Sequence, residues 1–253
     1  MKLNYKTVGE GYPLIILHGL FGSSDNWISI AKKLENKRKI YLLDQRNHGD
    51  SPHSEVFTYE NMASDLKEFV DDHKLTCFEL MGHSMGGKTA MLFATQYPEL
   101  VNKLIVVDIA PKHYPTHHDT IIEGLKAIGL QSIKSRNEAD VTLAKYVPST
   151  GIRQFLLKNI KRTPEGFEWK INLKTIEKEI IEVGKALPEK STFKKPTLFI
   201  RGQHSNYIMD EDIKLIDNHF PQSKLVTINS ASHWVHAEQP DNFLEETIKF
   251  INE

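Results

Sequence analysis

Short runs of apolar residues alternate with longer segments of helical periodicity along most of the chain. The apolar runs predict strands over residues 2–8, 13–17, 38–43, 76–81, 103–108, 196–201 and 224–228. Apolar residues spaced three and four apart predict helices over residues 26–35, 58–73, 84–97, 209–219 and 240–252. This alternation is typical of an α/β fold with a doubly wound, mostly parallel sheet.

One long segment, residues 112–190, breaks the alternation because it has helical periodicity without strong strand signals. We expect it to form a helical cap inserted over the active site of a core made of residues 1–111 and 191–253. A cap in this place can close a pocket and exclude water. Phe155, Leu156 and Trp169 are therefore candidates for contact with substrate, and packing within the cap is the alternative for each.

The composition fits one globular domain and gives no sign of a partner bound through charge. A chain of 253 residues, 40% of them hydrophobic, can bury a substantial core as a single unit. The net charge of −1 gives no reason to expect nucleic acid or an anionic membrane as partner. The N-terminus lacks the apolar region of a signal peptide, and no run approaches the ~20 apolar residues of a membrane span. We expect a cytoplasmic monomer or homodimer, and a packing role for Cys77 inside its apolar strand.

A nucleophilic serine is predicted at the end of the fourth apolar run. Gly82-His-Ser84-Met-Gly86 matches the pattern G-x-S-x-G, and it stands between a strand and a helix. That context is typical of a nucleophile elbow, a tight turn that lifts the serine Oγ above the sheet. The turn strains the serine backbone and leaves no room for a Cβ two residues to either side. Ser84 is therefore the candidate nucleophile.

A serine hydroxyl needs a histidine base, and the chain order Ser, acid, His places that base near the C-terminus. His233 follows the last predicted strand and therefore lies at the same sheet edge as the elbow. His236 is the alternative, but a surface or capping role fits it better. The small residues before His233 leave its ring free to reach inward.

Two backbone N–H groups are candidates for an oxyanion hole. One belongs to Met85, the residue after the nucleophile, and the other lies in the loop His18-Gly-Leu-Phe-Gly-Ser-Ser24 after the second strand. Spacing leaves Leu20 and Phe21 open as the second donor. Phe21 and Trp234, which flank the predicted machinery, are also candidates for contact with substrate.

The acid is the member of the triad that the residues leave open. The loop after the strand at 196–201 carries Ser205 where a carboxylate is commonly found, and its first carboxylate is Asp210. The preceding strand ends in Asp108, and that strand end is the other place from which a carboxylate could reach the same imidazole.

Together these motifs resemble the α/β-hydrolase superfamily over nearly the whole chain, most strongly outside residues 112–190. They are His18-Gly19 with Gly22, Asp44-Gln-Arg46-Asn-His48-Gly49, the elbow, Asp108-Ile-Ala-Pro111, Arg201-Gly202 and Ser232-His233-Trp234. Within the superfamily the chain resembles the small YbfF-type esterases of bacteria and their mitochondrial relatives. That resemblance implies Asp108 as the acid, with Ser205 joining the network. It also implies esterase activity and, as a further possibility, acyl-CoA thioesterase activity.

The expected function is hydrolysis of carboxylic esters or thioesters of small to medium acyl groups through an acyl-enzyme on Ser84. No cofactor or metal is expected, since the serine chemistry needs none and the spacing of His113, His117, His118 and Asp119 matches no ligand pattern. Asp44, Arg46 and His48 are expected to stabilise their loop. The same fold and triad also support hydrolysis of C–C bonds or lactones, cofactor-free haloperoxidation, a quinone-pathway lyase or a triad-bearing receptor.

Overall fold

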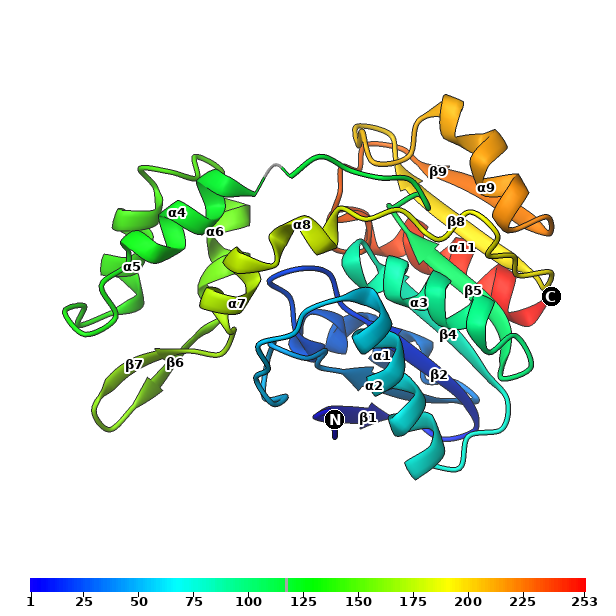
Figure 1. Ribbon diagram of the computed structural model, residues 1–253, viewed down its shortest axis with the longest axis horizontal. Coiled ribbons are helices and arrows are strands. Elements are labelled where there is room, and N and C mark those ends of the chain that lie inside the picture. The colour runs from blue at the N-terminus through cyan, green and yellow to red at the C-terminus, as the bar shows by residue number, and fades with distance from the viewer. Residues whose placement is uncertain (117) are drawn as a thin grey trace.

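The centre of the computed structural model, which describes residues 1–116 and 118–253, is a seven-stranded sheet in the order β1-β3-β2-β4-β5-β8-β9 (Figure 1). The outermost β1 is antiparallel to β3, and the other neighbouring strands are parallel. The predicted α/β fold with a mostly parallel sheet is confirmed. The strands are β1 (Tyr5–Val8), β2 (Tyr12–Leu17), β3 (Arg38–Leu43), β4 (Phe78–His83), β5 (Val101–Val107), β8 (Thr197–Gly202) and β9 (Ser223–Ile228).

Helices cover both faces of this sheet because its central strands are apolar on both sides. In β2, for example, Ile15 and Leu17 join one buried apolar cluster, and Leu14 and Ile16 join the other. The first cluster packs under α2 (Tyr59–Asp72), α3 (Met85–Gln96) and α9 (Ile213–His219). The second packs under α1 (Ile28–Leu34), α10 (Val235–Glu238) and α11 (Pro240–Asn252). Short 3-10 turns, η1 (Ser24–Trp27) and η2 (Asp210–Asp212), lead into α1 and α9.

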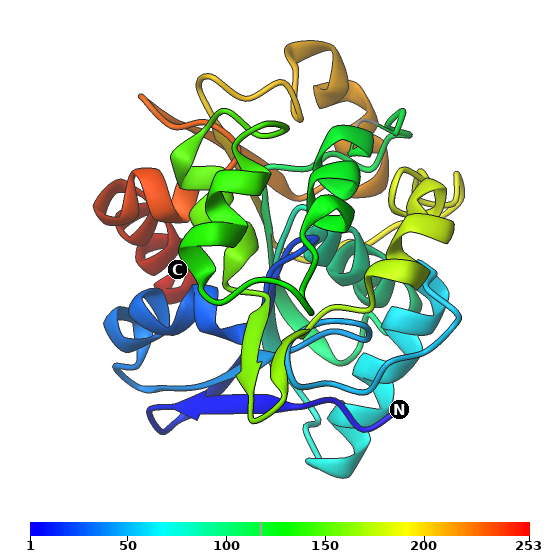
Figure 2. The same cartoon turned by 90° about the vertical axis from the view of Figure 1, so that its left-hand side faces the viewer.

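The segment between β5 and β8 stands to one side of the sheet (Figure 1) and lies in front of it when that side faces the viewer (Figure 2). It contains α4 (Asp119–Ala127), α5 (Arg136–Leu143), α6 (Thr150–Leu157), β6 (Ile160–Thr163), β7 (Gly166–Trp169), α7 (Leu173–Lys178) and α8 (Ile180–Val183). The segment is largely helical, as expected. The antiparallel hairpin of β6 and β7 is a difference, since the helical periodicity did not predict it.

Two buried polar side chains connect this segment to the rest of the chain, one through α3 and one through the loop after β2. Lys88, on α3, donates from Nζ to the carbonyls of Lys112 at 2.7 Å and Gly184 at 3.3 Å, and also to that of Lys185. It therefore joins the chain entering the segment to the chain leaving it. Burial lowers the pKa of Lys88 to about 7. Asn159 is 3% exposed and donates from Nδ2 to the Phe21 carbonyl at 2.7 Å.

Cys77 is exposed, just before β4 begins, and accepts a hydrogen bond from the Tyr12 hydroxyl at 3.1 Å. The expected packing role inside the strand is therefore wrong, because β4 begins at Phe78, one residue after Cys77.

Among the described helices, none combines the length and the apolar character needed to cross a bilayer.

Candidate active site

Ser84 stands on the sharp turn between β4 and α3. Its backbone has φ 53° and ψ −118°, a region that side chains other than glycine rarely occupy. A Cβ at Gly82 would lie 2.2 Å from the Gly86 carbonyl oxygen, and a Cβ at Gly86 would lie 2.5 Å from the His18 carbonyl oxygen. The two glycines are thus needed for the turn to close, as the sequence predicts for an elbow.

Ser84, His233 and Asp108 form a continuous chain of hydrogen bonds. His233 Nε2 lies 3.0 Å from Ser84 Oγ, and His233 Nδ1 lies 2.7 Å from Asp108 Oδ2. The three side chains come from the carboxyl ends of β4, β5 and β9, which meet at one edge of a parallel sheet. The structure therefore brings together the predicted nucleophile, base and acid in the geometry of a catalytic triad.

Asp108 is enclosed and held by donors on both carboxylate oxygens. It is fully buried at the end of β5 with φ 52°, and Oδ1 accepts the Gly202 N–H at 3.0 Å. Oδ2 accepts the Ser205 hydroxyl as well as His233. Burial raises the pKa of Asp108 to about 7, and the hydrogen bonds from Ser205 and Gly202 keep it from rising further. The alternative acid, Asp210, is 81% exposed and pairs with Arg201 at 2.7 Å.

Two residues that the sequence analysis did not single out hold His233 in place. The Tyr207 ring stacks on the imidazole at a centroid distance of 3.9 Å and an interplanar angle of 18°. His83 Nε2 lies 2.9 Å from the His233 carbonyl, and burial lowers the pKa of His83 well below its usual value. A neutral His83 therefore donates from Nε2 to that carbonyl. The only sequence signal for the contact of His83 with His233 is the place of His83 inside G-x-S-x-G. For Tyr207, the sequence gives no signal other than its place in the loop that contains Ser205.

His236 is buried, and the expected surface or capping role is wrong. Its ring stacks on Trp27 at 4.0 Å with an interplanar angle of 12°, and it packs edge-on against Phe243. Burial lowers the pKa of His236 well below its usual value, so the ring is neutral. The short helix α10 turns this side chain toward the core, whereas His233 precedes α10 and reaches Ser84.

The hydrogen bonds of the loop after β2 distinguish the two candidate oxyanion donors. The Phe21 N–H donates to His48 Nε2 at 3.1 Å and is therefore occupied. The Leu20 N–H donates to no acceptor within residues 1–116 and 118–253. Met85 is the first residue of α3, where N–H groups have no acceptor in their own helix. This leaves Leu20 and Met85 as the candidate pair.

His48 and its loop stabilise this arrangement. His48 Nδ1 donates to the Arg46 carbonyl at 3.0 Å, so Nε2 remains an acceptor for Phe21. Burial lowers the pKa of His48 to about 3, which keeps the ring neutral. Arg46 forms a buried pair with Asp65 at 2.6 Å, and Asp44 accepts the N–H of Ser24 at 2.7 Å. Asp44, Arg46 and His48 thus make the structural contacts that were expected of them.

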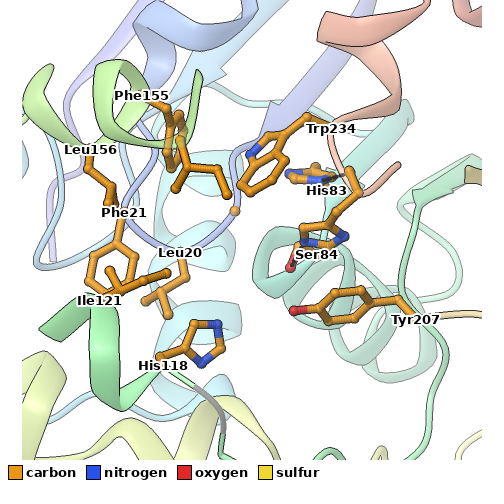
Figure 3. Close-up of a pocket in the computed structure, with 13 residues that line it drawn as sticks. Leu20, Phe21, His83, Ser84, His118, Ile121, Phe155, Leu156, Tyr207 and Trp234 are labelled. Carbon is orange, nitrogen blue, oxygen red and sulfur yellow. Dashed lines mark hydrogen bonds between the residues drawn. The ribbon is translucent and has the colours of Figure 1, made fainter. Parts of the chain in front are cut away.

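A cavity of about 270 Å³ opens above Ser84 (Figure 3). Four of the five candidate substrate contacts, Phe21, Phe155, Leu156 and Trp234, line it. The lining also includes Leu20, Ile121, Ile152 and Tyr207. The cavity is therefore mainly apolar around Ser84, which would suit an acyl group. Trp169 instead packs against the hydrophobic core from β7.

The sequence predicts no metal site among the histidines at the start of the inserted segment. His118 lines the cavity above Ser84. His117 lies outside the described residues. Within the part of the chain that the structure describes, no three His, Cys, Asp or Glu side chains gather as a metal ion would require.

Comparison with known proteins places this geometry among hydrolases. Residues 12–129 match the family model described as the alpha/beta hydrolase fold. The chain is 40% identical over 252 residues to a protein of Danio rerio named sn-1-specific diacylglycerol lipase ABHD11, covering 96% of this chain and 79% of that protein. It is 33% identical over 261 residues to Esterase YbfF of Escherichia coli, covering 100% of both chains. A solved structure titled Marine microorganism esterase superposes with a TM-score of 0.96 at 47% identity, covering 98% of this chain and 99% of that one.

Proposed function

The chain belongs to the α/β hydrolase fold family and is an enzyme that hydrolyses esters, and we propose that it does so through an acyl-enzyme on Ser84. The substrates in this proposal are small-molecule carboxylic esters, or thioesters, of small to medium acyl groups. The observation that carries it is the chain of hydrogen bonds from Ser84 Oγ through His233 to the buried Asp108. The mainly apolar cavity above Ser84 supports an acyl substrate.

In this mechanism Asp108 holds the His233 tautomer whose proton is on Nδ1, so Nε2 can take the proton of Ser84. Ser84 Oγ then attacks the ester carbonyl, and the N–H groups of Leu20 and Met85 donate to the oxyanion that forms. His233 returns the proton to the leaving oxygen or sulfur, which departs as an alcohol or thiol. Water repeats the cycle on the acyl-enzyme and releases the acid.

We also propose that residues 112–190 act as a cap on a core formed by residues 1–111 and 191–253. Ile121, Ile152, Phe155 and Leu156 from this segment line the cavity that contains Ser84. Closing the cavity with apolar side chains removes water around the oxyanion and strengthens its hydrogen bonds. The cytoplasmic location and the monomeric or homodimeric state expected from the sequence stay predictions.

Steady-state hydrolysis of p-nitrophenyl butyrate tests the proposal. We expect turnover that continues beyond one equivalent of product, which distinguishes an enzyme from a receptor that binds without deacylation. A parallel screen of butyryl thioesters, lactones and diketones tests the reaction class. No turnover of any open-chain ester or thioester, together with turnover of a diketone or lactone, would contradict the proposal.

A further inference from the structure

A second cavity, of about 440 Å³, adjoins the one that contains Ser84. The two share Ile152, Phe155 and Trp234 as a common wall. The rings of Phe155 and Trp234 lie 5.9 Å apart, at the end of the catalytic cavity opposite His118 (Figure 3). At this distance the two rings are in contact and form the wall between the two cavities. The larger cavity begins on the far side of this wall, and a substrate that displaces or passes around the two rings would enter it.

The position of His233 indicates which part of an ester this second cavity would receive. His233 must return a proton to the leaving-group oxygen, so the leaving group lies on the His233 side of Ser84. The second cavity is built on that side, because Ser232, Trp234 and Ala237 from the chain around the base form one of its walls. The acyl group then extends the other way, toward Leu20 and Ile121.

The lining of the second cavity is amphiphilic and carries no net formal charge. Apolar surface comes from the shared wall and Ala237, and neutral hydrogen-bonding groups come from Asn26, Ser149 and Gln154. Its charged residues are one lysine, Lys158, and one glutamate, Glu238. Phosphate groups are recognised by clusters of cationic side chains. This lining therefore fits an uncharged leaving group with hydroxyl or ether oxygens.

We propose that the second cavity is a leaving-group subsite, so that the preferred substrates are esters of extended, uncharged, hydroxyl- or ether-bearing alcohols. The inference rests on the proposed ester hydrolysis and adds the class of alcohol to it. Since the second cavity is larger than the catalytic one, selectivity should depend more on the alcohol than on the acyl chain.

A variant that fills the second cavity tests the assignment. Gly151 lines this cavity from α6, and the nearest atom that a Cβ there would meet in the described part of the chain, apart from its neighbouring backbone, is Ser149 Oγ at 4.0 Å. Gly151→Phe therefore adds a ring in open space. The matched control is Val141→Phe on the neighbouring helix α5, where the native side chain is 61% exposed and lines neither cavity. Ala237→Phe fills the second cavity from its other wall if Gly151→Phe does not fold.

The quantity to measure is the ratio of kcat/KM for triethylene glycol monobutyrate to kcat/KM for ethyl butyrate. Both esters have the same acyl group, so the ratio reports the leaving group alone. We expect wild type to prefer the longer alcohol, Gly151→Phe to lower the ratio by about tenfold or more, and Val141→Phe to leave it unchanged. A tenfold change corresponds to about 1.4 kcal/mol of transition-state binding.

Three results would overturn the inference. In the first, the ratio is the same in Gly151→Phe, Ala237→Phe and wild type. In the second, filling the cavity instead lowers kcat/KM for ethyl octanoate relative to ethyl butyrate, which would assign the cavity to the acyl chain. In the third, wild type prefers a matched alcohol that ends in a carboxylate. Failure of wild type to hydrolyse any of these esters would contradict the proposed function itself.

Discussion

Replacement of Asp108 by asparagine tests the acid, and the structure fixes how the new amide would lie. The Gly202 N–H donates to Oδ1 at 3.0 Å, so the amide oxygen should remain there and the NH₂ group should replace Oδ2. That NH₂ group would then donate to His233 Nδ1, which now lies 2.7 Å from Oδ2. The proton of His233 would move to Nε2 and point at Ser84, which is the unproductive tautomer.

The expected loss of kcat in Asp108→Asn follows from the hydrogen bonds that the two tautomers of His233 gain and lose. The productive tautomer loses a hydrogen bond to a charged group, about 1.5–3 kcal/mol, and the unproductive one gains a neutral bond, about 0.5–1.5 kcal/mol. Together these terms correspond to about thirtyfold to two-thousandfold in rate. Loss of the carboxylate charge beside the imidazolium of the transition state adds to this. We therefore expect Asp108→Asn to lower kcat by about 10³ to 10⁴.

The assay is kcat for p-nitrophenyl butyrate at one pH, with the melting temperature as a check on folding. Asp210→Asn is the matched control, because Asp210 is 81% exposed and its partner Arg201 lies outside the chain from Ser84 to Asp108. Its kcat should stay within about twofold, since exposed ion pairs contribute little. A loss below tenfold in a folded Asp108→Asn, or a severe loss in Asp210→Asn, would refute the assignment of the acid.

Three further substitutions test the surroundings of the triad. Ser205→Ala should lower kcat about fivefold to tenfold. It should also move the rise of kcat/KM, expected near pH 7, to higher pH, because the hydrogen bond from Ser205 lowers the pKa of Asp108 and its loss raises that pKa; an unmoved profile would contradict this. His236→Ala should cost about 3 kcal/mol of unfolding free energy in urea titrations, since it empties a buried site against Trp27, while kcat stays within about tenfold. Lys88→Met should lower the free energy of unfolding by about 1–3 kcal/mol, because carbonyls at both ends of residues 112–190 lose their donor. An unchanged melting temperature would show that these hydrogen bonds do not stabilise the fold.

The fold and the triad were accessible from sequence because both depend on local patterns. The apolar runs of a parallel sheet and the helices between them appear directly in the chain, and β3 and α11 coincide with the predicted residues 38–43 and 240–252. The order of Ser84, Asp108 and His233 follows from strand ends that must meet at one sheet edge. The remaining choice of acid came from the family resemblance rather than from spacing.

What the sequence did not predict depends on three-dimensional packing. The hairpin of β6 and β7 has a local signal, a turn at Pro164-Glu165 before Gly166, but its strands are only four residues each. No pattern distinguishes a histidine stacked on Trp27 from one at the surface. The occupied N–H of Phe21 depends on His48, which is 27 residues away in sequence. These contacts require the folded chain.

The central claim is that Ser84 is the nucleophile activated by His233. Its most direct test is labelling of the folded protein with a fluorophosphonate, followed by mass spectrometry of the modified peptide. We predict one adduct, on Ser84, which is absent from Ser84→Ala and formed far more slowly in His233→Ala. An adduct on a different residue, or labelling of Ser84→Ala at the wild-type rate, would contradict the account.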